Sequence, residues 1–531
     1  MSRIQRRSFF ILLFSFLLLG MPAWGGEDWR FDVGTNVTVG GGQHAPFWLT
    51  ANRHGLASLE PNSAYLRTAA TRDYQRTRGL DWEFCADAAF GTLNNINIGI
   101  ASDASGWGDP QFVLQQLYAG VRYGCWQLTL GSRERTSQGK NALLTSGGMT
   151  WSGNARPIPQ VRFGISDYTP VTFLFHDWLS VKGFVSYGRT TDDAFQRQHV
   201  SPARYALYTQ RALFHEKSFF FRVGKHQVSP LSLEIGLEMD CQFGGELWEH
   251  DVRLSPSDED KLLFANPRRA ADFLKALLPL SGGDGSTLSD QNNAAGNHFG
   301  SIHAALDYEP SEWQLRAYYE HYFDGRTGMT PWNKTRDMAG QPHVWIAYPW
   351  FDGLYGLEFS LPRNPIVSTV VVEYNTTRDQ CGAIHHSSTA TLPASIHGFA
   401  CYYYNSSYPS YQHHGMTAGS PLLYSPLYNA DHTLINTDTR LRALHLGISG
   451  DPTPALRYRL LGTFVRSWGS YMDPLPDPQN TLSALAELTC TPRTFAGWTA
   501  TAALALDRSP RLGNNTGVQV GIRKRFALNE K

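Results

Sequence analysis

Strict alternation of apolar and polar residues is the feature that most constrains the fold of this chain. From Leu231 to Asp240 every odd position is apolar, and the even positions include Glu234 and Glu238. Successive side chains of a β-strand point to opposite faces, so one face of this strand is apolar and the other carries carboxylates. The same period recurs in further stretches, at 96–100, 179–187, 355–361 and 498–506. The chain is therefore predicted to be rich in strands.

Polar turns follow many of these strands, for example at 188–193, 449–452 and 507–510. Strands of about 9–11 residues joined by such turns are typical of a transmembrane antiparallel β-barrel, an all-β fold, and this chain length predicts about 16–18 strands. Alternation alone leaves open which face meets lipid. A soluble sandwich or a lipocalin-like barrel shows the same period with its apolar face inside.

The N-terminus favours the membrane alternative. Three arginines within the first seven residues precede an apolar run, Phe9 to Leu19. This order is typical of a secretory signal peptide, which we place at residues 1–25. The run is too short for a comfortable membrane span, so an uncleaved anchor is the weaker interpretation. Export permits insertion into the outer membrane of a Gram-negative bacterium, with residues 26–531 as a single barrel domain.

Composition is consistent with this class. Lys+Arg and Asp+Glu both number 46, so no net charge attracts nucleic acid. Charged residues make up 17% of the chain and aromatic residues 13%, which suits amphipathic strands with aromatic girdles at the membrane interfaces. We predict such girdles at Tyr318, Tyr319 and Tyr322 and at 402–404. A final strand at 516–526 ends on an aromatic residue, as in outer-membrane barrels.

One segment interrupts the strand pattern. Asn266 and Pro267, followed by 268–278, predict a short helix, because Asn is a favoured N-cap and Pro is favoured in the first turn. A flexible linker at 281–286 follows the helix. We therefore predict a helix-containing insertion at about 255–295. It is either a surface loop or a segment folded into or over the lumen, as in plugged barrels.

The densest unusual stretch runs from position 151 to 161. Its two prolines exclude a central strand, so it is a loop or the entry to a strand. It offers a stacking face, two amides and a guanidinium, the groups that hold sugar rings and acidic substituents. These groups belong to Trp151, Asn154, Arg156 and Gln160. The alternative is a rigid connection whose polar groups satisfy backbone atoms, and the residues alone favour that alternative.

Six motifs resemble those of the Wzi-type capsule assembly family, in the branch found in Bacteroides-like bacteria. They extend in one order over nearly the whole mature chain: TANRHGL at 50–56, WSGNARPIPQVR at 151–162, GNHFGS at 296–301, YYEHYFDG at 318–325, WFDGLYG at 350–356 and HHGMTAGSPLLYSPLYN at 413–429. The resemblance implies an eighteen-stranded outer-membrane barrel with a small helical element on the periplasmic side. It also implies a lectin-like role, in which the protein binds capsular polysaccharide and keeps the capsule attached.

These motifs contain further candidate ligand-binding residues. Aromatic and acidic side chains together are common in carbohydrate sites, although tyrosine and tryptophan also mark membrane interfaces. The candidates are Arg53 in the first motif, Glu320 and His321 in the fourth, and Trp350 and Asp352 in the fifth.

Metal and catalytic chemistry find little support. Adjacent histidines on a strand point to opposite faces, so neither the pair at 385–386 nor the pair at 413–414 can chelate a metal alone. The sequence has no GxSxG, HExxH or phosphate-loop motif. Glu234 and Glu238 lie about 13 Å apart by strand rise, too far for a glycosidase pair, and more simply line a polar lumen. We predict no cofactor, no metal and no enzymatic activity.

The sequence thus predicts a surface lectin that acts as a monomer and binds no nucleic acid. Its predicted partners are capsular polysaccharide, outer-membrane lipid and, during biogenesis, the barrel assembly machinery. Two alternatives stay open: a porin or glycan-export channel, and a barrel enzyme acting on lipid or glycan. Occlusion of the lumen by loops such as 243–297 would distinguish a lectin from a channel. Turnover that depends on one Ser or His would establish an enzyme.

Overall fold

The computed structural model describes residues 29–76, 79–93, 111–172, 177–225, 228–253, 260–280, 294–324, 329, 332–336, 342–346, 348–380, 385–387, 395–397 and 401–527. The predicted signal peptide and the linker at 281–286 lie outside these residues.

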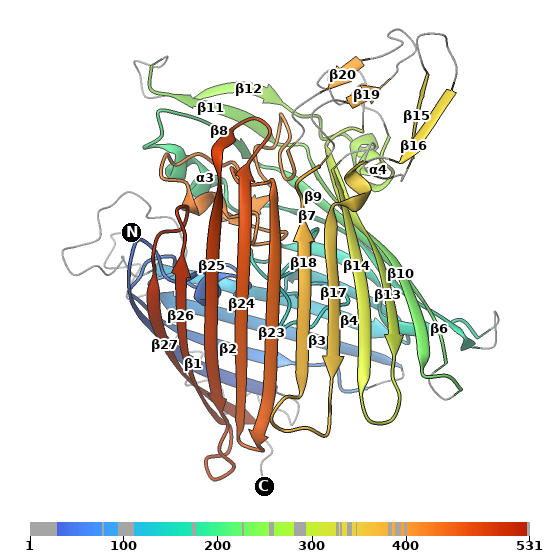
Figure 1. The fold of residues 1–531 in the computed structure, drawn as a ribbon, viewed down its shortest axis with the longest axis vertical. Coiled ribbons are helices and arrows are strands. Elements are labelled where there is room, and N and C mark those ends of the chain that lie inside the picture. Colours follow the sequence, from blue (N-terminus) through green and yellow to red (C-terminus); the bar gives the residue numbers. More distant parts are fainter. Residues whose placement is uncertain are drawn as a thin grey trace.

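Eighteen antiparallel strands form one closed sheet, which confirms the predicted fold class (Figure 1). Each strand pairs with the next one around the barrel, and the last pairs with the first, where Phe526 lies opposite Phe31. In order the strands are β1 (Trp29–Gly41), β2 (Ser63–Arg72), β3 (Leu80–Gly91), β4 (Gln111–Tyr123), β5 (Trp126–Ser132), β6 (Gln160–Pro170), β7 (Leu179–Arg189), β9 (Leu213–Val223), β10 (Leu231–Phe243), β13 (Asn297–Tyr308), β14 (Gln314–Asp324), β17 (Gly353–Ser360), β18 (Thr369–Thr376), β23 (Leu441–Thr453), β24 (Leu456–Gly469), β25 (Pro474–Cys490), β26 (Trp498–Arg508) and β27 (Thr516–Ala527).

The apolar face of the strands points outward. On β10 the exposed fractions of Leu231, Leu233 and Ile235 are 47%, 42% and 49%, whereas Ser232 and Glu234 between them are each 2% exposed. This is the reverse of a soluble barrel, whose apolar side chains fill the interior. The structure therefore decides the alternative that alternation left open, because an apolar outer surface and a polar interior fit a wall surrounded by lipid.

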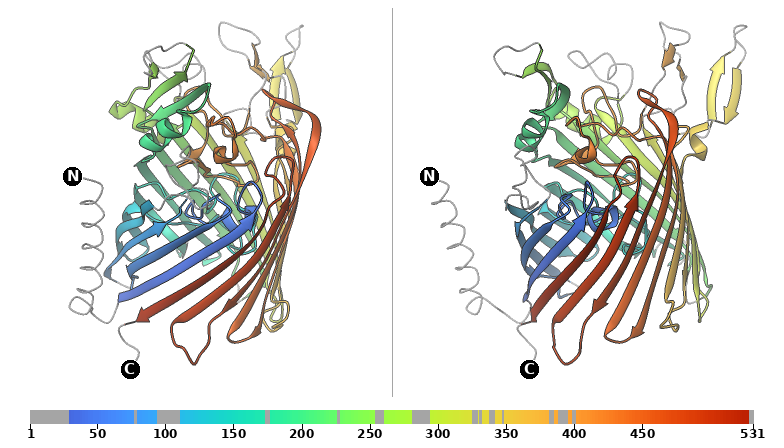
Figure 2. Two further views of the ribbon diagram at one scale, coloured as in Figure 1. Left: turned by 90° about the vertical axis from the view of Figure 1, so that its left-hand side faces the viewer. Right: turned by 60° about the vertical axis from the view of Figure 1, so that its left-hand side comes forward.

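The two ends of the barrel differ. The C-terminal end of the last strand and the short turns, such as the one at 124–125, lie at one end, and the long connections lie at the other (Figures 1 and 2). We call the second end the long-loop end. Outer-membrane barrels keep short turns on the periplasmic side and long loops outside, so the long-loop end is expected to face the cell exterior.

The long connections carry short elements of their own. A three-stranded sheet of β8, β11 and β12 lies beyond the barrel rim, and the remaining pairs are hairpins. The elements are α2 (Phe47–Thr50), α3 (Asp193–Val200), β8 (Tyr205–Gln210), β11 (Glu246–Asp251), β12 (Lys261–Ala265), α4 (Ala270–Leu277), β15 (Trp332–Arg336), β16 (Pro342–Ile346), η3 (Tyr348–Phe351), β19 (His385–Ser387), β20 (Ser395–His397), β21 (Gln412–His413), β22 (Met416–Thr417) and η4 (Pro426–Tyr428).

The helix predicted at 268–278 is α4, but it begins later than the sequence indicated. Its N-cap is Arg269, whose backbone N–H donates to Asp272 at 2.7 Å, so this contact and not Asn266 closes the first turn. None of the helices among the described residues is long and apolar enough to cross a membrane. The three α-helices that these residues form all belong to connections of the long-loop end. The periplasmic helical element implied by the family resemblance is therefore absent from the described residues.

Three long connections fold back into the barrel, at residues 42–62, 133–159 and 401–440 (Figure 2). We call these segments the plug. Their apolar side chains form one cluster inside the wall, in which Phe47, Leu144 and Leu423 are 3%, 0% and 0% exposed. The lumen is thus occupied by these three segments. The described part of the predicted insertion lies elsewhere, since its helix α4 packs against β9 and β10.

The predicted tyrosine girdles are wrong for Tyr318, Tyr322 and residues 402–404, whereas Tyr319 takes the outward face of β14, with its ring centroid 4.6 Å from that of Tyr355. Tyr322, Tyr402 and Tyr403 are at most 1% exposed and belong to the cluster inside the barrel. Alternation on β14 places Tyr318 and Tyr322 on the inward face, and residues 402–404 lie in the plug. Sequence clustering of tyrosines did not reveal which face each ring takes.

Candidate functional site

The inner wall of the barrel carries a set of carboxylates that bind the plug. Each stands at an inward position of a different strand, and each accepts a hydrogen bond from a plug residue. We call them the wall carboxylates: Glu216 on β9, Asp240 on β10, Glu320 on β14, Glu358 on β17, Glu373 on β18, Glu487 on β25 and Asp507 on β26. The plug is therefore attached to seven strands of the barrel, between β9 and β26.

Several wall carboxylates bind backbone N–H groups of the plug. The N–H of Phe47 donates to Asp507 at 2.9 Å, and the N–H of Ser146 donates to Glu373 at 2.7 Å. A buried N–H must find an acceptor, because an unsatisfied donor costs about 1–3 kcal/mol. Bonds to a charged acceptor are also stronger than neutral ones. Irregular loops can thus pack inside the barrel without losing their hydrogen bonds.

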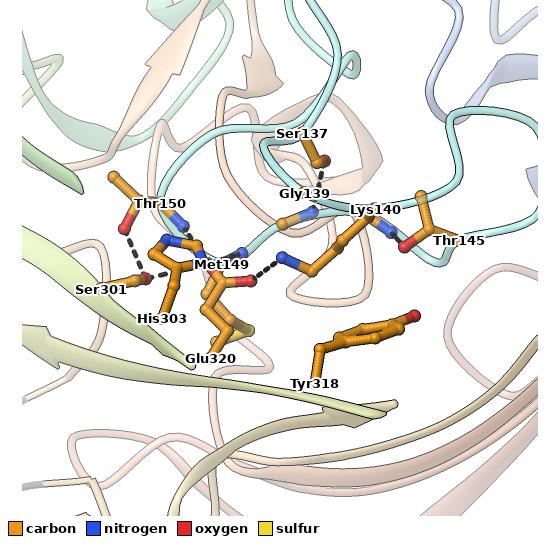
Figure 3. Close-up of polar contacts among 12 residues, drawn as sticks. Ser137, Gly139, Lys140, Thr145, Met149, Thr150, Ser301, His303, Tyr318 and Glu320 are labelled. Carbon is orange, nitrogen blue, oxygen red and sulfur yellow. Dashed lines mark hydrogen bonds and ion pairs between the residues drawn. The ribbon is translucent and has the colours of Figure 1, made fainter. Parts of the chain in front are cut away.

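Glu320 makes the most complete set of these contacts (Figure 3). Its Oε1 accepts hydrogen bonds from Met149 N at 2.8 Å and Ser301 Oγ at 2.9 Å, and its Oε2 accepts one from Lys140 Nζ. The side chains of Glu320 and Lys140 are 1% and 2% exposed. Because neither charge reaches water, each depends on the other for its compensation.

A group with metal-ligand chemistry adjoins this pair. Glu238, His303 and Glu320 place ligand atoms within 4.8 Å of one another, since His303 lies opposite Glu320 in the pairing of β13 and β14. His303 Nε2 is 3.5 Å from Glu238 Oε2. The Lys140 ammonium already balances Glu320, and a second cation at the same oxygens would repel it. The arrangement is better explained as a buried ion-pair network, and the absence of a bound metal stays a prediction.

The loop predicted to bind sugar lies inside the plug. The exposed fractions are 3% for Trp151, 0% for Asn154, 6% for Arg156 and 7% for Gln160. Asn154 joins the three plug segments, because its Oδ1 accepts from Asn52 N at 3.1 Å and its Nδ2 donates to Thr417 O at 2.8 Å. One side chain thus links three connections that are far apart in the sequence.

The other predicted residues of this loop also contact residues of the plug or the wall. The Arg135 guanidinium lies 4.6 Å from the ring centroid of Trp151. Arg156 Nε donates to Gly55 O at 3.4 Å, and burial lowers the pKa of Arg156 to about 10, so it stays charged at neutral pH. Gln160 donates to Glu216 at 3.2 Å. These groups bind the plug and the wall, as the alternative of a rigid connection predicts, and sugar binding by this loop stays a prediction.

Two other predicted residues belong to contacts between plug and wall. Arg53 donates to Glu487 at 2.7 Å, and Arg459 of β24 shares the same carboxylate oxygen at 2.8 Å. Glu320 is the wall carboxylate described above. Both residues therefore hold the plug in place.

The last three predicted residues form a separate cluster beside β14 at the long-loop end. The His321 ring stacks on Trp350 with 4.3 Å between centroids, and His321 Nδ1 is 3.0 Å from the carbonyl oxygen of Asp352. Burial raises the pKa of Asp352 to about 8, so this carboxyl is mainly protonated at neutral pH. The structure thus divides the predicted residues between the plug and this rim cluster, and it does not bring them together in one pocket.

Sequence reasoning missed Lys140 and most wall carboxylates. Glu373 stands at an inward position of a Val-rich strand, and Glu216 does so among phenylalanines, so a charge within an alternating apolar stretch was the available signal. Lys140 lies in an irregular polar loop, where no periodicity marks it.

These observations define a transmembrane β-barrel whose lumen is filled by its own loops. The fold is similar to the solved structure of Wzi, an outer membrane protein involved in group 1 capsule assembly in Escherichia coli and described as a carbohydrate-binding β-barrel. The TM-score is 0.52 at 12% identity, over 94% of this chain and 85% of that chain.

Two other solved structures align over similar lengths. OccK8 (OprE) of Pseudomonas aeruginosa has a TM-score of 0.44 at 9% identity, over 95% of this chain and 99% of that chain. OccAB2 of Acinetobacter baumannii has a TM-score of 0.43 at 10% identity, over 95% of this chain and 100% of that chain. No family model and no curated protein matches the sequence. The likeness to Wzi shows the barrel fold, and nothing in these comparisons supports the Bacteroides-like branch.

Proposed function

We propose that this protein is an outer-membrane surface lectin, without enzymatic activity, that binds capsular polysaccharide and helps to attach and organise the capsule. Export by the signal peptide and insertion by the barrel assembly machinery are part of this proposal. The observation that carries it is the filled lumen, because a barrel whose interior is bonded to its own loops suits an anchor better than a channel. The similarity of the fold to that of a carbohydrate-binding barrel supports the same proposal.

The motifs on which the family resemblance rests add to this support. Those at 50–56, 151–162 and 413–429 each lie wholly or mainly in one segment of the plug. Three of the six motifs that resemble the family therefore belong to the segments that fill the lumen. An anchor needs a rigid barrel, and the plug supplies rigidity without occupying the outer surface.

A glycan would reach the protein at the long-loop end. Exposed arginines gather there, where the β7–α3, β8–β9 and β12–α4 connections meet. The side chains of Arg189, Arg211 and Arg268 are 54%, 54% and 43% exposed, and the last two lie 3.0 and 3.7 Å from Glu246. Guanidinium groups bind carboxylate and phosphate or sulfate substituents in a bidentate manner, so this surface suits an acidic polysaccharide. We place the first glycan contact here.

Removal of these arginines is expected to weaken glycan binding. Each charged hydrogen bond contributes about 1.5–3 kcal/mol, so Arg211→Ala together with Arg268→Ala should raise the Kd by at least about tenfold. Binding of the purified, vesicle-inserted protein to acidic capsular polysaccharide from the source organism measures this. Arg363→Ala is the matched control, since that side chain is 76% exposed but lies in the turn between β17 and β18, at the opposite end. Equal affinity of all variants would remove this surface from the site.

Loss of the gene should release the capsule. Deletion in the source organism is expected to move capsular polysaccharide from the cell-bound to the soluble fraction without reducing its total amount, because anchoring and synthesis are separate steps. A capsule that stays fully attached contradicts the anchoring role. Open single-channel steps of the wild-type protein in planar bilayers would instead favour the channel alternative.

A further inference from the structure

The outward face of β10 changes character along the strand. Its lower half is exposed at Leu233 and Ile235, whereas Cys241 and Phe243, on the same face further up, are 0% and 3% exposed. The helix α4 covers them, since Ala276 of α4 forms one buried cluster with Cys241 and Phe243. Because these β10 residues point away from the lumen, α4 lies against the outside of the barrel, near the long-loop end (Figure 1).

Outward side chains of neighbouring strands hold α4 there. Tyr187 of β7 donates from its hydroxyl to the carbonyl oxygen of Phe273 at 2.8 Å. Lys217 of β9 donates to the carbonyl oxygens of Ala276, at 3.2 Å, and of Leu277. An ammonium at the carboxyl end of a helix is favourable, because the last carbonyls carry partial negative charge. The helix is therefore fixed to the wall.

The free face of α4 and of the three residues after it is apolar. Leu274, Leu278 and Leu280 are 53%, 50% and 47% exposed. The charged residues of the helix, Asp272 and Lys275, are turned inward, with side chains 13% and 22% exposed and paired at 3.6 Å. A surface helix in water shows the reverse arrangement, with its charges outward. This helix is built for apolar surroundings.

The surroundings of the helix identify its partner. Its exposed leucines extend the apolar outer surface formed by Leu233 and Ile235 of β10 towards the long-loop end. Arg269, the N-cap of the helix, adds an exposed cationic side chain. An apolar face with adjacent cationic side chains is the pattern of helices that lie in a membrane interface.

We propose that α4 and the residues directly after it form an interfacial segment that inserts Leu274, Leu278 and Leu280 into the lipid leaflet nearer the long-loop end, with Arg269 against lipid phosphates. The helix replaces the upper part of β10 as the lipid-contacting surface and so fixes how deeply the barrel sits in the membrane. This inference rests on the membrane-spanning fold and does not depend on the lectin proposal.

Lipid-borne quenching tests this placement. A single cysteine is introduced as Leu274→Cys, labelled with a fluorophore, and the full chain is inserted into phosphatidylcholine vesicles containing lipids that carry a nitroxide on the acyl chain. Leu233→Cys on β10 is the control for lipid contact, and Leu262→Cys on β12 is the control for an exposed leucine beyond the rim; these two leucines are 42% and 45% exposed. Wild-type protein taken through the same labelling gives the contribution of the native cysteines.

We expect quenching at position 274 to equal that at 233 and to exceed that at 262 several-fold. Quenching no stronger than at 262 would overturn the proposal, because the helix would then face water or another protein. Insertion of each single-cysteine variant is checked separately, by its resistance to extraction from the vesicles at alkaline pH. Failure here would leave the glycan-binding measurements unaffected, so the two proposals are tested separately.

Discussion

Replacement of Lys140 by methionine is expected to destabilise the protein by about 3–5 kcal/mol, because it leaves the carboxylate of Glu320 buried without its counter-charge. Both side chains are almost completely excluded from water. The loss should appear as a lower free energy of unfolding in a urea titration of the vesicle-inserted protein. Lys261→Met is the control, since that lysine is exposed on β12 and its replacement should change stability by less than about 0.5 kcal/mol.

A double variant separates charge compensation from packing. Glu320→Gln keeps a side-chain oxygen for Met149 N and Ser301 Oγ, so adding it to Lys140→Met should restore much of the lost stability. If the double variant is as unstable as the sum of the single ones, the pair contributes by packing alone. A stable Lys140→Met variant would show that the plug does not depend on this ion pair.

Replacement of Ile235 by lysine should cost about 2–4 kcal/mol, the cost of a cation on the lipid face near the membrane midplane. Ile235 is 49% exposed on the outward face of β10. The matched variant is Leu262→Lys, at a leucine 45% exposed beyond the barrel rim, which should change stability little because that side chain meets water. A larger loss of unfolding free energy for Ile235→Lys than for Leu262→Lys, at similarly exposed positions, would show that lipid surrounds the wall. Equal losses in urea unfolding would contradict it.

The wall of the barrel could be predicted from the sequence because the alternation of apolar and polar residues is read within a single strand. On β10 the identity of each residue indicates its face, and the structure follows that pattern from Leu231 to Gln242. The direction of the apolar face had to be inferred from a second pattern, the predicted signal peptide, because alternation is the same in a soluble barrel. The number of strands followed from chain length and from the family resemblance.

The plug could not be predicted because its contacts are distant in sequence. Asn154 binds residues that lie 102 and 263 positions away, and no periodicity marks such partners. The same polar and aromatic groups suit a sugar site and a buried junction between loops. The sequence therefore identified Asn154 and Arg156 as unusual residues, and only the fold showed that they face inward.

Closure of the wall has a consequence for the order of assembly. β27, with 12 residues, is the last strand of the chain, and it pairs with β1, so that Arg525 contacts Asp32 across 493 positions. Until β27 has emerged, β1 presents an unpaired edge to any other strand. Contacts of such long range are also the slowest to form. A chain that lacks β27 would thus leave the barrel open, with unpaired edges on β1 and β26. Because unpaired edges pair with strands of other chains, such a truncated protein is expected to self-associate through this opening.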